Sequence, residues 1–265
     1  MEVEQCLKSD EKDPSPVSSL DEFVRRVMSW SESVIFRGQT KREGWPLVPS
    51  AGRDSDRSLI PWDGHEHKVL EEFERESIPY LDHLPANDWQ WLALAQHNRL
   101  PTRLLDWTKN PLVALWFAVK DPPVDCCPGL VWALYYTDLR AVSNTKDLKG
   151  SPFDIECTHL YFPEHMYPSI QAQSSVFTVH PCEKNSNPAR FPPLGESIND
   201  SDLILRNIEV SAESFSIIRY QLFRVGISPA SLFPGLQGIV DKIRYENIRC
   251  QDEGRDGHEH SQSHT

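Results

Sequence analysis

Residues 92–119 read LALAQHNRLPTRLLDWTKNPLVALWFAV, two apolar segments with a polar segment between them. The first segment predicts a helix that starts from a cap at Asn87 and ends near residue 97. The second predicts a helix with Asn110 as its cap and Pro111 at its first helical position, ending near residue 119. The chain is therefore expected to fold back on itself here, and the polar segment must be accommodated between two packed helices.

The polar segment between these helices is predicted to be a buried loop. Its backbone and side-chain groups all need hydrogen-bond partners, and Arg103 and Asp106 can satisfy each other as an ion pair. A second interpretation is that His97, Arg103 or Asp106 faces a pocket. The polar and aromatic residues concerned are Gln96, His97, Arg99, Thr102, Arg103, Asp106, Trp107 and Thr108.

The rest of the chain predicts an α+β fold: a single domain with peripheral helices around a mixed or antiparallel sheet. Helices come early, strands lie mid-chain, and no regular alternation of strand and helix is evident. Apolar spacing and capping residues predict further helices at 20–30, 66–77, 215–225, after 228–229 and at 239–248. Strands are predicted at 33–40, 130–136, 176–180 and 203–210, and a proline-rich loop at 181–200.

Both ends of the chain are predicted to be disordered tails, at 1–18 and 251–265, around a domain at 19–250. The chain of 265 residues has 27 Lys and Arg against 39 Asp and Glu, a net charge of −12. Residues 1–20 and 251–265 together hold nine acidic and three basic residues, so half of this charge lies near the ends. The acidic balance argues against general nucleic-acid binding and against binding to anionic membranes.

Several function classes lack their sequence signals. The phosphate-binding loop, the dinucleotide-binding glycine pattern, the nucleophile elbow of serine hydrolases and the H-E-x-x-H zinc motif do not occur. His65-Glu66-His67 is expected to be an exposed helix start, and no metal site is predicted. The apolar run 112–119 is too short to cross a membrane. The six scattered cysteines predict free thiols and a cytoplasmic location.

A second distinctive segment is Ile35-Phe36-Arg37-Gly38-Gln39. An arginine at the end of an apolar strand beside a glycine can hold phosphate oxygens, or it can cap carbonyls or pair with a core carboxylate. Residues 34–53 carry a local charge of +3 and residues 97–109 a charge of +2. If the two segments meet in space, they would form a site for a small anionic nucleotide ligand.

These segments together resemble the FRG domain family, which is named for the aromatic-Arg-Gly triplet found here at 36–38. The resemblance includes the W-x-L-x-P-S-like segment at 45–50, the block from 95 to 111, QAQSSVFT at 171–178 and Leu-Phe-Pro at 232–234. It extends over roughly residues 20–245, nearly all of the expected domain.

The resemblance implies a fold similar to ADP-ribosyltransferases, with NAD as the substrate. In that arrangement Arg37 holds the diphosphate, and Gln173, Ser174 and Ser175 line the nicotinamide pocket. The catalytic residue would come from 233–238, where this chain has Gln237 instead of the usual acid, and Asp241 follows one helical turn later. The complete set of candidate NAD-binding residues is Arg37, Gly38, Gln39, His97, Arg103, Asp106, Gln173, Ser174 and Phe177.

Two functional hypotheses follow. In the first, the protein is an ADP-ribosyltransferase-like enzyme that transfers ADP-ribose from NAD to an acceptor such as a protein, or that hydrolyses NAD. In the second, it is a non-catalytic nucleotide- or protein-binding module of a defence or regulatory system. The local positive charge favours the first hypothesis, and the missing acid favours the second.

Overall fold

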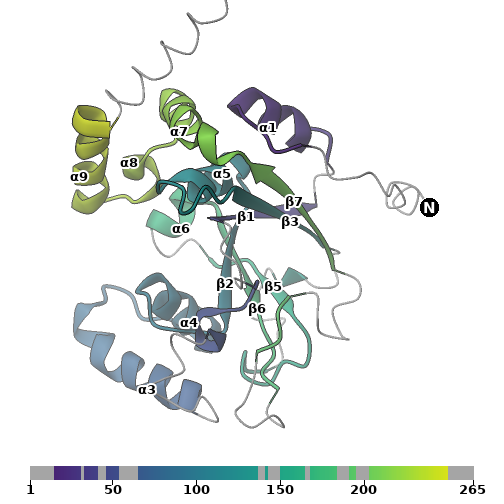
Figure 1. Ribbon diagram of the computed structural model, residues 1–265. Coiled ribbons are helices and arrows are strands. Elements are labelled where there is room, and N and C mark those ends of the chain that lie inside the picture. The colour runs from purple at the N-terminus through teal and green to yellow at the C-terminus, as the bar shows by residue number, and fades with distance from the viewer. Residues whose placement is uncertain are drawn as a thin grey trace, which may run out of the picture.

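The computed structural model contains one sheet with helices packed on it (Figure 1). It describes residues 15–30, 33–40, 46–53, 65–136, 141–142, 150–164, 168–183, 191–194 and 203–249. Within these residues the sheet has seven strands in the order β4-β5-β6-β2-β1-β3-β7. Neighbouring strands are antiparallel, except for the parallel pair β4 and β5 at one edge. The predicted α+β class with a mixed sheet is confirmed.

The elements have the following bounds. The strands are β1 Val34–Thr40, β2 Leu104–Thr108, β3 Gly129–Tyr135, β4 Ala141–Val142, β5 His159–Tyr161, β6 Ser175–Val179 and β7 Ile204–Val210. The α-helices are α1 Leu20–Val27, α3 His65–Ser77, α4 Asp88–His97, α5 Pro111–Val119, α6 Pro168–Ala172, α7 Phe215–Arg224, α8 Pro229–Leu232 and α9 Leu236–Arg244. A π-helical segment, Tyr245–Arg249, continues from α9.

The sheet divides between β1 and β2. These two central strands share one register pair, Phe36 with Thr108. By contrast, β1 pairs with β3 at seven positions and β2 with β6 at five. Figure 1 shows β2 running away from β1 at a steep angle beyond their contact. The sheet therefore consists of two halves, β1-β3-β7 and β2-β6-β5-β4, joined at one point.

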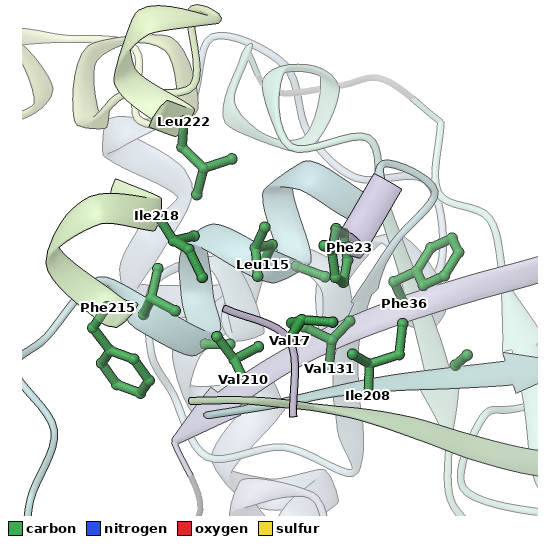
Figure 2. Close-up of a cluster of buried hydrophobic side chains, with 14 of the residues drawn as sticks. Val17, Phe23, Phe36, Leu115, Val131, Ile208, Val210, Phe215, Ile218 and Leu222 are labelled. Carbon is green, nitrogen blue, oxygen red and sulfur yellow. The ribbon is translucent and has the colours of Figure 1, made fainter. Parts of the chain in front are cut away.

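Each half of the sheet has its own core. Helices α1, α5 and α7 cover β1-β3-β7, where Phe36, Leu115 and Ile218 are among the buried side chains (Figure 2). Helices α3 and α4 cover β2-β6, and their cluster includes Leu92 and Phe177. A third cluster lies on the opposite face of the sheet and joins the two halves.

The two helices predicted from residues 92–119 are confirmed with their caps. The Asn87 side chain accepts a hydrogen bond from the backbone N–H of Gln90, and that of Asn110 accepts one from Leu112. The predicted loop between them is wrong, because residues 104–108 form β2. A central strand that is buried on both faces has no clean alternation of apolar and polar residues, so its sequence lacks the pattern that predicts a strand.

The predicted N-terminal tail also ends earlier than residue 18. Val17 is fully buried and forms a parallel bridge with Val210. Its N–H donates to the carbonyl of Glu209, and its carbonyl accepts from Ser211. A single valine between polar residues and a proline gives too little pattern to predict this contact. Residues 1–14 and 250–265 lie outside the described residues.

Two further expectations concern cysteines and membranes. Cys126, Cys127, Cys157 and Cys182 carry free thiols, as predicted, and Cys6 and Cys250 lie outside the described residues. In the part of the chain that the structure describes, none of the helices has the length and apolar character needed to cross a membrane.

Candidate functional site

The aromatic-Arg-Gly triplet on β1 has three different environments. Side chains alternate between the two faces of a strand. Phe36 belongs to the core under α5, whereas the next residue, Arg37, lies on the opposite face of the strand. At Gly38 a Cβ atom would collide with the backbone carbonyl of Ala114 in α5. The glycine therefore lets α5 pack closely against β1, which fixes one wall of the site beside Arg37.

A cavity of about 630 Å³ lies where β1 and β2 separate. Its lining comes from both halves of the sheet, from the end of α4, from α5, from the segment before β6 and from the region of α8 and α9. This volume lies within the range of about 300–1,000 Å³ that is usual for small-molecule sites. The division of the sheet thus produces a ligand-sized space at its centre.

Arg37 is one of the charged residues that line this cavity. Its Nη1 donates to the backbone carbonyl of Asp106 at 2.7 Å and lies 3.9 Å from the Asp106 carboxylate. Its Nε is buried and has no hydrogen-bond partner among the described residues. The side chain is 17% exposed. Burial lowers the pKa of Arg37 to about 10, although Asp106 opposes the shift, so the group stays cationic at neutral pH.

The Asp106 carboxylate is held in place by a short chain of hydrogen bonds. Gln96 donates to it through Nε2 at 2.8 Å, and Thr102 donates its hydroxyl to Gln96 Oε1 at 2.7 Å. The nearby His97 has its pKa lowered by burial, with Asp106 acting in the opposite direction. One end of α4 is thereby tied to β2, and a neutral imidazole lies beside a carboxylate in the cavity.

The opposite wall connects three elements. Gln173 donates through Nε2 to the carbonyl of Leu232 at the end of α8, at 3.1 Å. Thr108 donates its hydroxyl to the carbonyl of Gln173 at 2.5 Å. On α9, Gln237 donates through Nε2 to the Asp241 carboxylate at 3.1 Å. An amide and a carboxylate of α9 therefore line the same cavity as Arg37.

The structure brings most of the candidate site residues together. Those that line the cavity are Arg37, Gly38, His97, Asp106, Gln173, Ser175, Gln237 and Asp241. Gln39, Arg103, Ser174 and Phe177 are outside its lining. Phe177 is 3% exposed and packs in the core under α4, stacked on Tyr161. Ser174 has left-handed backbone (φ 49°) and its carbonyl accepts from Lys109 N–H, so it shapes the turn before β6.

The predicted pairing of Arg103 with Asp106 is wrong. Arg103 directly precedes β2 and Asp106 is the central residue of that strand, and Arg103 turns into the interior beneath α3. There its Nε and Nη2 bind the Glu66 carboxylate, with Nη2 to Oε2 at 2.7 Å. Its Nη1 donates to the carbonyl of Pro152. The guanidinium is thus fully engaged, which removes Arg103 from the set that can face a ligand.

The expectation of an exposed helix start at residues 65–67 is wrong for Glu66, which is 7% exposed. His67 does lie at the surface, where it contacts Glu71. The partner of Glu66 is 37 residues away in the sequence. Local pattern therefore could not reveal that this acid is internal. Among the described residues no group of three or more His, Cys, Asp or Glu is arranged to hold a metal ion.

Arg99, Phe117 and Phe233 line the cavity but were not among the candidate site residues. Arg99 follows the end of α4 with a left-handed backbone, φ 67°. Such a conformation is uncommon for a residue other than glycine and often occurs at functional positions. The sequence signal for the unusual backbone of Arg99 was a helix that ends near Asn98 with no glycine after it. The two phenylalanines could be recognised only once α5 and α8 were known to meet.

The two cationic segments do meet, since β1 and β2 pair. Their charge is nevertheless partly used internally, by Arg103 at Glu66 and by Arg53, which donates to the Val48 carbonyl. Lys109 lies over the ring of Phe162. Of the described cations of these segments, Arg37 and Arg99 line the cavity. Lys41 and Arg42 lie outside the described residues.

The fold and the site define an α+β domain whose divided sheet encloses a ligand-sized cavity beside a half-buried arginine. Residues 32–125 match the family model of the FRG domain, the family that the sequence resembles. The match contains Arg37, His97 and Asp106, whereas Gln173, Gln237 and Asp241 lie beyond it. Comparisons with curated proteins and with solved structures gave no match.

Proposed function

We propose that this protein is an ADP-ribosyltransferase-like enzyme that binds NAD in the Arg37 cavity. It would transfer ADP-ribose to an acceptor such as a protein, or hydrolyse NAD. The observation that carries the proposal is the guanidinium of Arg37, with a buried Nε that has no partner among the described residues, at the point where the sheet divides. A buried cation with an unused donor is stabilised by an anion, and a diphosphate supplies one.

The surroundings of Arg37 support a diphosphate ligand. The carbonyl of Asp106 holds Nη1 and leaves the other edge of the guanidinium for a second acceptor. Arginine presents donors in a planar fork that matches phosphate oxygens in pairs. The NAD diphosphate would therefore lie along β1, with its nicotinamide half toward Gln173 and Ser175.

The reaction would break the bond between nicotinamide nitrogen and ribose C1′. Nicotinamide leaves with the electron pair, positive charge develops on the ribose, and an acceptor oxygen or water forms the new bond to C1′. The Asp241 carboxylate can stabilise the developing charge and take the proton of the attacking hydroxyl. Gln237, which donates to Asp241, would orient that carboxylate.

A non-catalytic nucleotide- or protein-binding module is the second candidate. The residue at the position where the resemblance implies an acid is Gln237, whose amide carries no charge and is already bonded to Asp241. An uncharged residue there gives less stabilisation to a developing positive ribose than a carboxylate does. A protein that binds NAD without cleaving it would fit this substitution.

We infer a cytoplasmic location, because the described cysteines form no disulfide and thiols stay reduced in that compartment. The small ligand would be an anionic nucleotide in either candidate function.

The test follows NAD binding and nicotinamide release by the purified full chain. Arg37→Gln is expected to abolish both, whereas Asp241→Asn is expected to preserve binding and reduce release at least about tenfold. Arg25→Gln is the matched control, because Arg25 pairs with Asp21 on the surface of α1. Binding without release by the unaltered protein selects the non-catalytic module. Absence of both binding and release overturns both NAD-based readings.

A further inference from the structure

A second cavity, of about 480 Å³, adjoins the first between α5, α7 and α9. The two cavities share four lining residues: Arg99, Phe117, Phe233 and Asp241. A molecule in the second cavity would therefore lie next to whatever occupies the Arg37 cavity. The functional site described above does not use this space.

The second cavity is walled by aromatic rings from different elements. On one side Trp116 packs against Phe117 and Phe233, with ring centroids 5.0 and 5.8 Å apart. On another side Phe223 of α7 contacts Tyr245, with centroids 5.2 Å apart. Rings fixed in this way present flat faces and edges to a planar group, and every nucleobase offers such a group for stacking.

The lining also carries a positive balance, with four cations against two carboxylates. Lys120 pairs with Asp121 at 2.6 Å, and Arg219 donates to the carbonyl of Val119 at 2.7 Å. The guanidinium groups of Arg99 and Arg244 have no hydrogen-bond or ion-pair partner among the described residues. In an acidic protein, two unengaged arginines beside an aromatic cavity favour a ligand that is both planar and anionic.

We propose that the second cavity binds a nucleotide, with its base against the aromatic rings and its phosphate at Arg99 and Arg244. The binding itself does not depend on NAD chemistry. Its role as the acceptor of ADP-ribose rests on the proposed function. In that role a ribose hydroxyl oxygen of the nucleotide bonds to C1′ of NAD as nicotinamide leaves with the electron pair. Asp241, which lines both cavities, takes the hydroxyl proton.

The test measures binding of 5′-GMP to the full chain by isothermal titration calorimetry. Guanosine and ribose 5-phosphate are expected to bind at least about tenfold more weakly, because each lacks one of the two recognised groups. Phe223→Ala and Arg244→Gln are each expected to weaken GMP binding by about tenfold or more. Arg224→Gln is the matched control. Arg224 lies on α7, the same helix as Phe223, and its guanidinium donates to the Tyr220 hydroxyl outside the cavity. Equal GMP affinity in all of these proteins overturns the proposal.

A second measurement does not depend on the variants being folded. Photo-crosslinking with 8-azido-GMP is expected to label peptides that contain residues 116–120, 219–223 or 241–245, which contribute to the lining. Label confined to other peptides overturns the proposal.

The relation to NAD separates this proposal from the proposed function. Arg37→Gln should leave GMP affinity unchanged, and saturating NAD should not displace GMP. Displacement would place both ligands in one site and would overturn the proposal. GMP binding at the second cavity without any release of nicotinamide would keep the site and refute the proposed enzyme. Nicotinamide release without GMP binding would support the proposed enzyme and overturn the second nucleotide site.

Discussion

The Glu66 carboxylate in the first turn of α3 accepts four hydrogen bonds from Arg103, three from the guanidinium and one from the backbone N–H. Both side chains are less than 10% exposed. The pair fastens α3 to the strand that forms one side of the Arg37 cavity. Its role is therefore to hold the second half of the molecule together, next to the site but not in it.

Glu66→Ala is expected to destabilise the protein by about 3–5 kcal/mol, because it leaves the buried guanidinium of Arg103 without its counter-charge. Urea denaturation followed by circular dichroism measures the loss. Glu71→Ala on the same helix is the control, since Glu71 is exposed and pairs only with His67 in the described structure. Equal losses for the two variants would show that the Glu66 pair contributes no more than a surface contact.

Gly38→Ala is expected to lower the free energy of unfolding by about 3 kcal/mol or more, because its Cβ meets the backbone of α5 and cannot be relieved by a rotamer change. Gly226→Ala offers a comparison: Gly226 has φ 90° and open space around it, so only the cost of a left-handed backbone for alanine, about 1–2 kcal/mol, is expected. Differential scanning calorimetry ranks the two. A smaller effect at position 38 than at 226 would contradict the close packing of α5 on β1.

Arg37→Met is expected to leave the ligand-free protein as stable as the original chain or more stable. Burying a charge that is poorly compensated costs free energy, and a methionine of similar length removes that charge. The same substitution is expected to abolish the rise in melting temperature that the proposed binding of NAD would produce. A large destabilisation without ligand would instead assign Arg37 a structural role through Asp106.

His180 should make stability fall in acid. It is 1% exposed, and its Nε2 lies 2.9 Å from the Thr178 hydroxyl, which accepts from the indole N–H of Trp107. Thr178 then donates to a neutral imidazole. Burial, with Arg103 and Arg37, lowers the pKa of His180 to about 3. The unfolded chain takes up this proton near pH 6.5 and the folded protein does not, so stability is retained above pH 6.5 and lost from there down to about pH 3.

Between pH 6 and 4, His180 contributes a loss of about 1.4 kcal/mol per pH unit. His97, whose pKa burial also lowers, acts in the same direction. His180→Gln should therefore reduce the slope of unfolding free energy against pH, as measured by urea denaturation at several pH values. An unchanged slope would mean that His180 is protonated in the folded protein.

The sequence predicted the elements whose signals are local. The caps at Asn87 and Asn110 determined two helices correctly, and the short β-branched run before Gly38 identified β1. Arg37 was identified as a candidate because an arginine at the end of an apolar strand beside a glycine can hold phosphate oxygens. These features depend only on residues within a few positions of one another.

What could not be predicted depends on distant partners. Arg103 was predicted to form an ion pair with Asp106, three residues away. Its actual partner is Glu66, and the sequence around Glu66 does not indicate that this residue is buried. Strand β2 was missed because side chains on both of its faces are buried, Leu104 in one cluster and Leu105 and Trp107 in another. The second cavity needs α5, α7 and α9 together, and no single segment indicates it.

The single register pair between β1 and β2 also bears on how the protein holds together when it is empty. With separate cores under α5 and under α4, the two halves are expected to be distinct cooperative units whose amide protons exchange with solvent at different rates. A ligand that reaches from Arg37 to Gln173 would span this boundary and add to the contacts that the Phe36–Thr108 pair and the third cluster already make across it. Ligand binding would thereby couple the two halves, so that regions that open separately in the empty protein would open together.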